Sequence, residues 1–414
     1  MKIFKFLAVA LVAMLGFTAC DKDCDHDFIE HDHSADLVGT WSCLTENYAE
    51  VLIINADGSA VSYGVEDGEY WENVKGTVTV KENNITMIFE DDANFTGHFD
   101  IIPGMAFSLF EDSGERYIYN CCANDLSDEI VGMWVCADGP YDKENDMVIQ
   151  TFDENGTVTK TGWSVASNEF IVKETIAYKV VGDLIFHQRS SDMVIEGVAP
   201  HFASKLTYMP NASQLGDMLT NTAIKLVNGQ AIELSMSMLR IKQSLDLTGT
   251  TYDYSSAYVS NAKGKDEDFS MLGHTFNMAN IKGHNLDMMF RSELFSVDLN
   301  ANSITQRFRA NGRDIEIVIP ITVDDNKVTL DLSAENPAYR KVDMYMFQDA
   351  DNSQLHMYMH TNDFINYFAN MELYNLLASG EITASNTTAI EKVYTDMEAR
   401  IESINVSFVL KARK

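Results

Sequence analysis

A short motif that occurs twice, 93 residues apart, constrains the fold of this chain more than any other feature. Residues 37–43 read Leu-Val-Gly-Thr-Trp-Ser-Cys and residues 130–136 read Ile-Val-Gly-Met-Trp-Val-Cys, so glycine, tryptophan and cysteine coincide. After each copy an apolar strand runs into a turn, at 55–58 and 153–156, that holds Asp-Gly or Asn-Gly and favours a hairpin. We therefore expect two similar domains, each beginning at one copy of the motif.

Apolar and polar residues alternate between the turns, as they do in half-buried strands. This alternation is seen at 76–81 and 85–89 in the first copy, and at 170–176 and 205–208 in the second. No long helical period interrupts it. Many short strands with turns at near-regular spacing predict a small antiparallel barrel or sandwich in each copy.

The Gly-x-Trp elements at Trp41 and Trp134 resemble the first strand of lipocalin-like domains of Bacteroidota lipoproteins, which belong to the wider calycin group. The resemblance covers roughly residues 36–210. It implies an up-and-down barrel in each copy, with the tryptophan as a core anchor. It also implies an arginine near the end of the barrel that stacks across this tryptophan. Arg116 is the candidate in the first copy, and the second copy offers only Lys205.

A third β-rich domain is expected from about Ser213, where strands lengthen and methionine becomes common: 13 of the 21 methionines lie in 213–414. The turn Asn228-Gly229 predicts a hairpin at its start. Apolar residues at helical spacing predict helices near 362–379 and 387–403, before a closing strand. The fold class is thus mainly β: two tandem small antiparallel lipocalin-like barrels, followed by a larger β-barrel or sandwich with two C-terminal helices. The expected domains are 36–122, 128–211 and 213–414.

The first residues have the layout of a secretory signal peptide, with Lys2 and Lys5 before an apolar stretch at 6–17. This stretch is too short for a stable transmembrane helix. Phe17-Thr18-Ala19-Cys20 resembles the lipobox of bacterial lipoproteins. The resemblance implies removal of residues 1–19 and lipidation of Cys20 with acyl chains of the palmitate kind. Several chains on one residue would anchor the protein stably to a membrane.

Residues 20–35 are rich in acid and histidine, and such a segment cannot bury apolar surface, so we expect a disordered tether. It resembles the acidic sorting signal of surface-displayed lipoproteins of Bacteroidota, which implies an outer-membrane protein that faces the extracellular side. The alternative is metal capture, although the paired spacings of a structural zinc site are missing. The residues that would capture a metal are Cys24, His26, His31 and His33.

A chain with a formal net charge of −32 repels nucleic acid and anionic lipid headgroups, and no nucleic-acid partner is expected. An exported location permits disulfides. If the first strand of the first domain closes against its last, Cys43 would meet Cys121 or Cys122. Free buried thiols are equally compatible with the sequence, and the pairing of Cys136 stays open as well.

Enzyme activity is not expected, because the common hydrolase, nucleotide-binding and haem-attachment motifs are absent from the sequence. No cofactor is predicted. Acidic residues are too plentiful for any one pair to stand out as a general acid and base. A metal site at His356 and His360 is not predicted either, since the two ends of such a strand segment lie about 13 Å apart.

A ligand pocket is expected in the third domain, between a methionine-rich hairpin and the helix that begins near 362. Thioether side chains adapt to irregular apolar ligands as readily as to irregular cores, so core packing is the alternative. The residues of this predicted pocket are Met344, Met346, Met357, Met359, Phe364 and Phe368.

The predicted function is binding of an extracellular ligand by a non-enzymatic surface lipoprotein, with a small apolar molecule held in a barrel cavity. Two alternatives stay open: a structural or adhesive role with a protein partner, and a glycan laid across loop aromatics. The candidate aromatics are Tyr63, Tyr70, Trp71, Tyr141 and Trp163.

Overall fold

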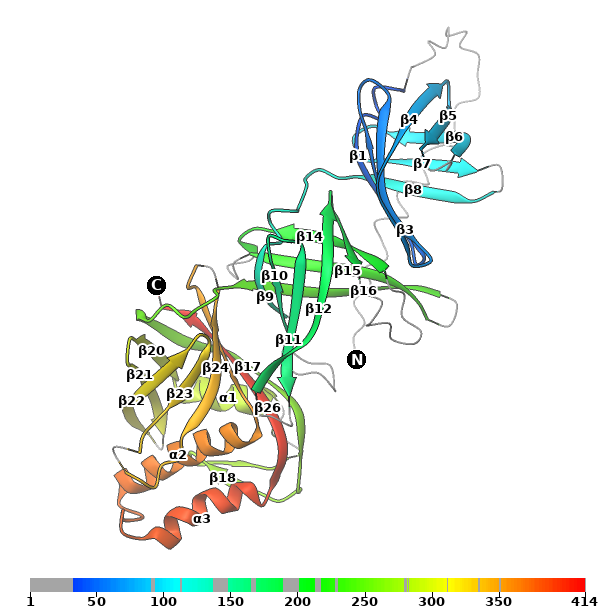
Figure 1. The fold of residues 1–414 in the computed structure, drawn as a ribbon. Coiled ribbons are helices and arrows are strands. Elements are labelled where there is room, and N and C mark those ends of the chain that lie inside the picture. The colour runs from blue at the N-terminus through cyan, green and yellow to red at the C-terminus, as the bar shows by residue number, and fades with distance from the viewer. Residues whose placement is uncertain are drawn as a thin grey trace, which may run out of the picture.

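The computed structural model describes residues 33–413 except 91–93, 112–113, 137–147, 165–168, 189–200, 213–216, 228–229, 279–280, 282, 311, 334–335 and 350. The predicted signal peptide, Cys20 and most of the predicted tether lie outside these residues. Three closed antiparallel barrels of eight strands each follow one another along the chain and lie in a row (Figure 1). This confirms the mainly β fold class, and it shows that the third domain is a barrel.

The first barrel is an up-and-down meander in which β1 pairs with β8 and places Trp41 opposite Cys121. The predicted hairpin turn after the motif is confirmed, since Gly58 has φ of 79°. Residues 33–37 form a turn over one end of the barrel, where Leu37 is fully buried. The strands are β1 (Gly39–Leu44), β2 (Tyr48–Ile54), β3 (Ser59–Glu66), β4 (Glu69–Lys81), β5 (Asn84–Phe89), β6 (Asn94–Ile102), β7 (Ala106–Glu111) and β8 (Arg116–Cys121).

The second barrel has the same order of pairing, with β9 between β10 and β16. Its first turn matches that of the first barrel, with Gly156 at φ of 77°. The strands are β9 (Gly132–Cys136), β10 (Val148–Phe152), β11 (Thr157–Ser164), β12 (Glu169–Val181), β13 (Leu184–Gln188), β14 (His201–Met209), β15 (Met218–Val227) and β16 (Gln230–Ile241).

The domain boundary expected between residues 211 and 213 is wrong. The strands before it, β9 to β14, cannot close the barrel alone, and β16 completes it by pairing with β9. The hairpin that we placed in the third domain therefore belongs to the second, although its turn, Asn228-Gly229, lies outside the described residues. The longer strands after residue 213 suggested a new domain. Strand length does not show which strands pair, however, and this barrel closes by pairing between segments that are distant in sequence.

The two motif tryptophans occupy equivalent positions. Trp41 Nε1 donates to the carbonyl of Leu37, and Trp134 Nε1 donates to that of Ile130, both at 2.7 Å. Both indoles are buried, so each motif anchors a core and ties the preceding turn to its barrel.

The arginine that the calycin resemblance implies is found in the second barrel, not the first. Arg240 on β16 lies over the Trp134 ring, 4.5 Å from its centre. The expectation that this copy offers only Lys205 was wrong because it followed from the misplaced boundary. Arg116 does not stack on Trp41: it lies over the Phe110 ring at 5.2 Å.

The third barrel closes between β17 and β26, the first and last strands of the domain. A hairpin of β18 (Phe269–Met271) and β19 (His274–Phe276) and the unpredicted helix α1 (Gly283–Ser292) interrupt the meander after β17. The barrel strands are β17 (Thr248–Gly264), β20 (Ser296–Asn300), β21 (Ser303–Ala310), β22 (Arg313–Asp324), β23 (Lys327–Leu330), β24 (Val342–Gln348), β25 (Gln354–Met359) and β26 (Ile401–Ala412).

Two helices precede the closing strand, α2 (Thr361–Ser379) and α3 (Thr387–Glu398). The end of the second helix differs from the expected residue 403, because Ile401 already pairs with Gly264 as the first residue of β26. Gly380, at φ of 77°, ends α2 in the left-handed conformation that favours glycine. Across the described part of the chain, no helix has the length and apolar character needed to span a membrane.

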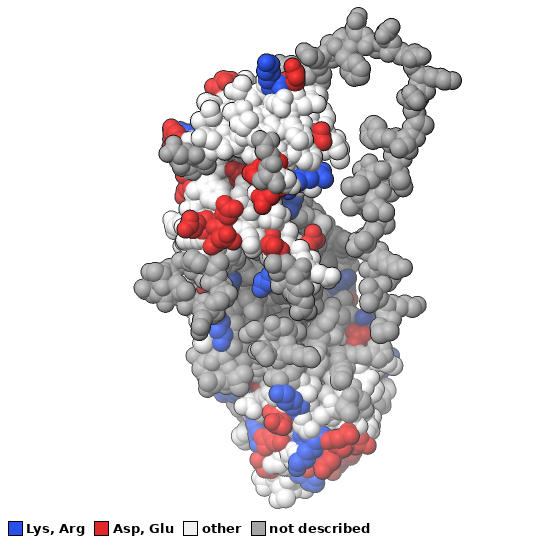
Figure 2. All heavy atoms as spheres, turned by 90° about the vertical axis from the view of Figure 1, so that its right-hand side faces the viewer, with Lys and Arg blue, Asp and Glu red and all other residues white. Residues whose placement is uncertain are grey.

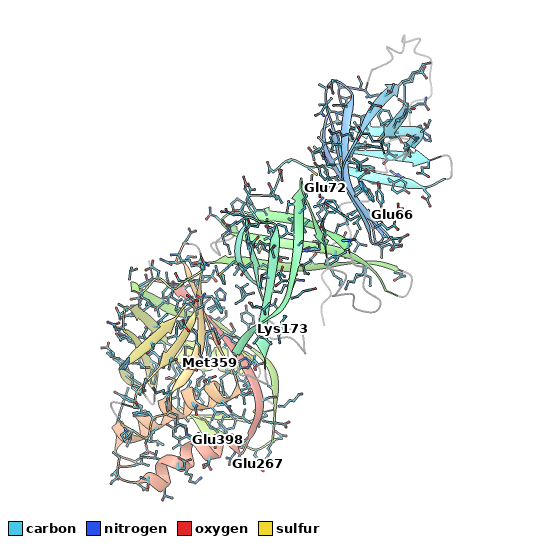
Figure 3. All side chains as sticks on the ribbon, viewed as in Figure 1. Glu66, Glu72, Lys173, Glu267, Met359 and Glu398 are labelled. Carbon is cyan, nitrogen blue, oxygen red and sulfur yellow. The ribbon has the colours of Figure 1, made fainter. Side chains whose placement is uncertain are left out.

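Apolar clusters join neighbouring barrels. Between the first and second, the Tyr70 and Phe186 rings lie 5.9 Å apart, and Glu72 forms an ion pair with Lys179. Figure 3 labels Glu72 at the end of the first barrel that lies next to the second. The buried residues of this contact are Ala49, Val51, Val65, Val181, Leu184 and Phe186. Those of the contact between the second and third barrels are Val135, Ile149, Leu239, Ile241, Phe347 and Tyr358.

Candidate functional site

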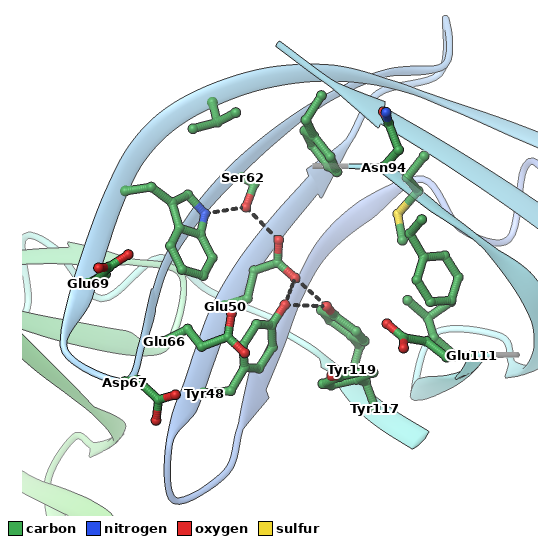
Figure 4. A pocket seen from close by; sticks show the side chains of 16 residues that line it. Tyr48, Glu50, Ser62, Glu66, Asp67, Glu69, Asn94, Glu111, Tyr117 and Tyr119 are labelled. Carbon is green, nitrogen blue, oxygen red and sulfur yellow. Dashed lines mark hydrogen bonds between the residues drawn. The ribbon is translucent and has the colours of Figure 1, made fainter. Parts of the chain in front are cut away.

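A cavity of about 730 Å³ opens at the end of the first barrel that lies beside the second (Figure 4). This volume lies within the range of pockets that hold small molecules. The opposite end is closed by the turn at 33–37 and by the Trp41 core. Figure 2 shows acidic side chains gathered over the part of the first barrel nearest the second.

The period of the strands builds the cavity, because alternate residues face the interior. Along β2 these residues run from Leu52 in the core to Glu50 and Tyr48 at the cavity. Along β7 they run from Leu109 to Glu111. Each strand is thus apolar toward the closed end and polar toward the mouth, so the barrel packs a core at one end and leaves space at the other.

Glu50 is the centre of the cavity's hydrogen bonds, although only 7% of it is exposed. Ser62 Oγ donates to Glu50 Oε1 at 2.5 Å, and the Tyr48 hydroxyl donates to Oε2 at 2.5 Å. The Tyr119 hydroxyl also donates to Oε2. Trp71 Nε1 donates to Ser62 Oγ at 2.8 Å, so one connected network runs from the indole to the carboxylate.

The two tyrosines stay protonated donors across the physiological range. Burial first, and then the negative charge of Glu50, raise the pKa of Tyr48 and of Tyr119 well above the ordinary value. The network therefore offers Glu50 only neutral donors.

Apolar and aromatic side chains make up most of the remaining wall. They are Trp71, Val74, Met87, Phe89, Phe95, Leu109 and Tyr117. Acidic side chains stand at the mouth: Glu66, Asp67, Glu69 and Glu111. None of the described residues that line the cavity is lysine, arginine or histidine.

The strand turn at the mouth holds its carboxylates close together. Asp67 and Gly68 have φ of 48° and 85°, the geometry of a two-residue hairpin turn. This turn places Glu66 and Glu69 directly opposite each other in the β3–β4 ladder. Like charges in such a pair destabilise a sheet.

The predicted pocket of the third barrel is filled in the structure. Its six residues are brought together, but each is at most 1% exposed within one continuous core. The nearby cavity has a volume of about 10 Å³, which is room for about one water molecule, and Tyr367 and Met371 rather than the six line it. Core packing accounts for these side chains, and their role in ligand binding stays a prediction.

The loop aromatics have roles inside the molecule. Tyr70 packs at the contact between the first two barrels, and Lys179 Nζ lies 5.3 Å from the centre of the Tyr63 ring. Trp71 is a wall of the cavity. Tyr141 and the Trp163 side chain lie outside the described part, so a flat row of exposed rings is not formed by the described members of the set.

The three cysteines whose side chains the structure describes are free thiols, and the side chain of Cys136 lies outside the described part. Strand β1 closes against β8 as expected, yet Cys43, Cys121 and Cys122 form no disulfide. Burial and then the charge of Glu50 raise the pKa of Cys43 to about 12. Sγ of Cys122 lies 3.0 Å from Asp183 Oδ1 and donates to it.

Metal ligands do not gather in the described residues, where no group of three His, Cys, Asp or Glu side chains could hold an ion. Cys24, His26 and His31 of the tether lie outside them. His33 lies 2.9 Å from Asp36. His356 and His360 are buried, and burial lowers the pKa of each, to about 4 and about 3.

Sequence reasoning missed the cavity of the first barrel. Its one signal was Glu50, a single acidic residue in the otherwise apolar strand Tyr-Ala-Glu-Val-Leu-Ile-Ile at 48–54. A carboxylate is almost never buried without a partner. Because acidic residues are frequent throughout this chain, that position did not stand out.

No protein-family model matches the chain, and no curated protein is significantly similar to it. Two solved structures of transferrin-binding protein B are similar to it. A double mutant of the vaccine antigen from Haemophilus parasuis has a TM-score of 0.24 and 10% identity, over 89% of this chain and 66% of that chain. The protein from serogroup B Neisseria meningitidis has a TM-score of 0.21 and 8% identity, over the same shares. The likeness is too weak to identify a family, an activity or a partner.

Proposed function

We propose that this chain is a non-enzymatic surface lipoprotein that binds a small extracellular molecule in the cavity of its first barrel. The cavity carries the proposal: about 730 Å³ of space, aromatic walls and a fixed polar group at its base are the features of a small-molecule site. The network around Glu50 holds the polar groups in place before a ligand arrives, which lowers the entropic cost of binding.

The signal peptide and the lipobox at Cys20 support the cell-surface part of the proposal. Anchored in this way, the protein would present the barrels outside the outer membrane. The absence of common hydrolase and nucleotide motifs supports the non-enzymatic part.

The test is native mass spectrometry of the full chain purified from its host, combined with extraction of bound small molecules. We expect a molecule of a few hundred daltons to co-purify with the wild type. Val74→Trp, which fills the cavity, should abolish it, because Val74 lines the wall. Val172→Trp is the matched control, since Val172 is 60% exposed on the second barrel.

The proposal fails if Val74→Trp and Val172→Trp retain the molecule equally, because the ligand would then lie elsewhere. It also fails if the wild type is empty and takes up none of the probes named below. Melting curves of both variants should match that of the wild type, which separates lost binding from lost folding.

A further inference from the structure

We infer that the ligand of this cavity is an organic cation, an amine or quaternary ammonium group on an apolar body. The inference rests on the proposed function and names the chemical class of the molecule bound at that same site.

The first observation is a buried carboxylate that no basic group of the described lining offsets. Ser62, Tyr48 and Tyr119 donate hydrogen bonds to Glu50, but all three are neutral. Buried charges in proteins are normally paired with an opposite charge. A cationic ligand would supply that charge at the base of the cavity.

The second observation is the charge of the mouth. Glu66 and Glu69 face each other across a strand pair, and Asp67 and Glu111 add two more carboxylates. Their arrangement, within a chain of net charge −32, concentrates negative potential at the entrance. The potential attracts cations and repels anions before contact.

The third observation is the set of aromatic rings around the carboxylate. The Tyr48 ring lies 6.2 Å from that of Trp71, inclined by 42°, and 5.2 Å from that of Tyr117, inclined by 56°. Rings inclined around one space are the means by which proteins hold alkylammonium groups through cation–π attraction. Each such contact is stronger in a desolvated site than at the surface.

These features do not suit the other simple classes of ligand. The acidic side chains form no group able to hold a metal ion among the described residues, and the apolar wall offers such an ion no ligands. An anion would meet five carboxylates, of Glu50, Glu66, Asp67, Glu69 and Glu111, and no basic side chain of the described lining. A neutral molecule would leave the charge of Glu50 without compensation.

The experiment compares probes of one shape and different charge by isothermal titration calorimetry with the full chain. Phenethylamine, 2-phenylethanol and phenylacetate form one set, and decylamine, decanol and decanoate form a second. We expect each amine to bind at least tenfold more tightly than its alcohol, and the acids not to bind. Raising the salt concentration should weaken amine binding, because mobile ions screen the mouth.

Substitutions show which carboxylates are responsible for the preference for a cationic probe. Glu50→Gln keeps the shape of the side chain and should remove the preference for amine over alcohol. A double substitution, Glu66→Gln with Glu69→Gln, changes two exposed strand residues that flank the turn and tests the mouth even if Glu50→Gln fails to fold. Glu154→Gln, an exposed turn position of the second barrel, is the matched control and should change nothing.

Each outcome decides between the two claims. Equal binding of amine and alcohol would overturn the cation inference and leave the proposed function standing. If no probe binds, the molecule that co-purifies decides: a neutral or anionic one contradicts the inference, a cationic one supports it, and an empty protein contradicts the inference and the proposed function together.

Discussion

The guanidinium carbon of Arg240 lies 4.5 Å from the centre of the Trp134 ring, and the guanidinium also donates hydrogen bonds to the carbonyls of Val131 and Glu129. Arg240 is on the last strand of the second barrel and Trp134 on the first, so the contact stabilises the pairing of the two strands that close the barrel. In the first barrel the Phe107 ring packs against Trp41 instead, in a T-shaped pair with ring centres 4.9 Å apart and planes inclined by 80°.

Loss of this contact should loosen the second barrel. Arg240→Leu removes the cation–π attraction and leaves two carbonyls without their donor, at a cost of about 2–3 kcal/mol. Hydrogen exchange should accelerate at the β9 and β16 amides while the first barrel is unchanged. Arg116→Leu is the control, because it contacts Phe110 and Ser108 rather than a motif tryptophan. If hydrogen exchange at the β9 and β16 amides accelerates equally in both variants, the contact between Arg240 and Trp134 does not stabilise the closure of the second barrel.

Gly64 should be needed for the shape of the cavity. A Cβ at this position would lie 2.1 Å from the Trp71 ring, so alanine forces the indole away and breaks its 2.8 Å hydrogen bond to Ser62. We expect Gly64→Ala to weaken ligand binding at least tenfold. Gly162→Ala is the control, since the nearest atoms to its Cβ would be those of the Lys173 side chain, no closer than 3.3 Å. Calorimetry with decylamine measures both, and unchanged affinity in Gly64→Ala would show that Trp71 is not part of the site.

The third barrel should lose stability in acid. Burial lowers the pKa of His356 to about 4 and of His360 to about 3, whereas both titrate near 6.5 when unfolded. Between these values the unfolded chain binds more protons, so the free energy of unfolding falls as pH drops from about 6.5 toward 4. Each histidine contributes a slope of up to about 1.4 kcal/mol per pH unit.

Denaturant unfolding of His356→Gln at several pH values checks this expectation. The variant should show a shallower decline than the wild type across that window. His98→Gln is the control, because His98 is an exposed residue of the first barrel that stacks on Phe110. If the free energy of unfolding has the same dependence on pH in the wild type and in His356→Gln, His356 does not contribute to the loss of stability in acid.

Lipidation should depend on Cys20 and not on Cys24. Cys20→Ala should leave the signal peptide uncleaved or the protein unanchored, because the acceptor thiol is gone, whereas Cys24→Ala should behave as wild type. Metabolic labelling with a palmitate analogue, followed by membrane fractionation, measures both effects. Label that persists in Cys20→Ala would place the anchor elsewhere.

The local elements of this fold could be predicted from sequence because their signals are local. Gly58 and Gly156 mark turns that need positive φ, and Trp41 and Trp134 mark equivalent first strands. The end of α3 could not be predicted in this way, since Ile401 and its neighbours fit a helical as well as a strand period.

The closure of the second barrel and the site could not be predicted for a different reason. Arg240 reaches Trp134 across more than a hundred residues of chain, and Glu50 meets Tyr119 across 69. Such pairs form only when particular strands become neighbours, and the residue composition of the chain does not show which strands do so. The methionine-rich hairpin illustrates the converse: its signal was plain, and the structure uses it to fill a core.

The mouth of the cavity shares its wall with the junction of the first two barrels. Tyr48 and Asp67 line the cavity and also a groove of about 230 Å³ between the barrels, whose other side holds His201 and Phe202. A molecule that moves either shared side chain therefore changes the joint as well. If a ligand of the cavity shifts Tyr48 or Asp67, thermodynamic linkage requires that a change in the contact between the two barrels also changes the affinity for that ligand.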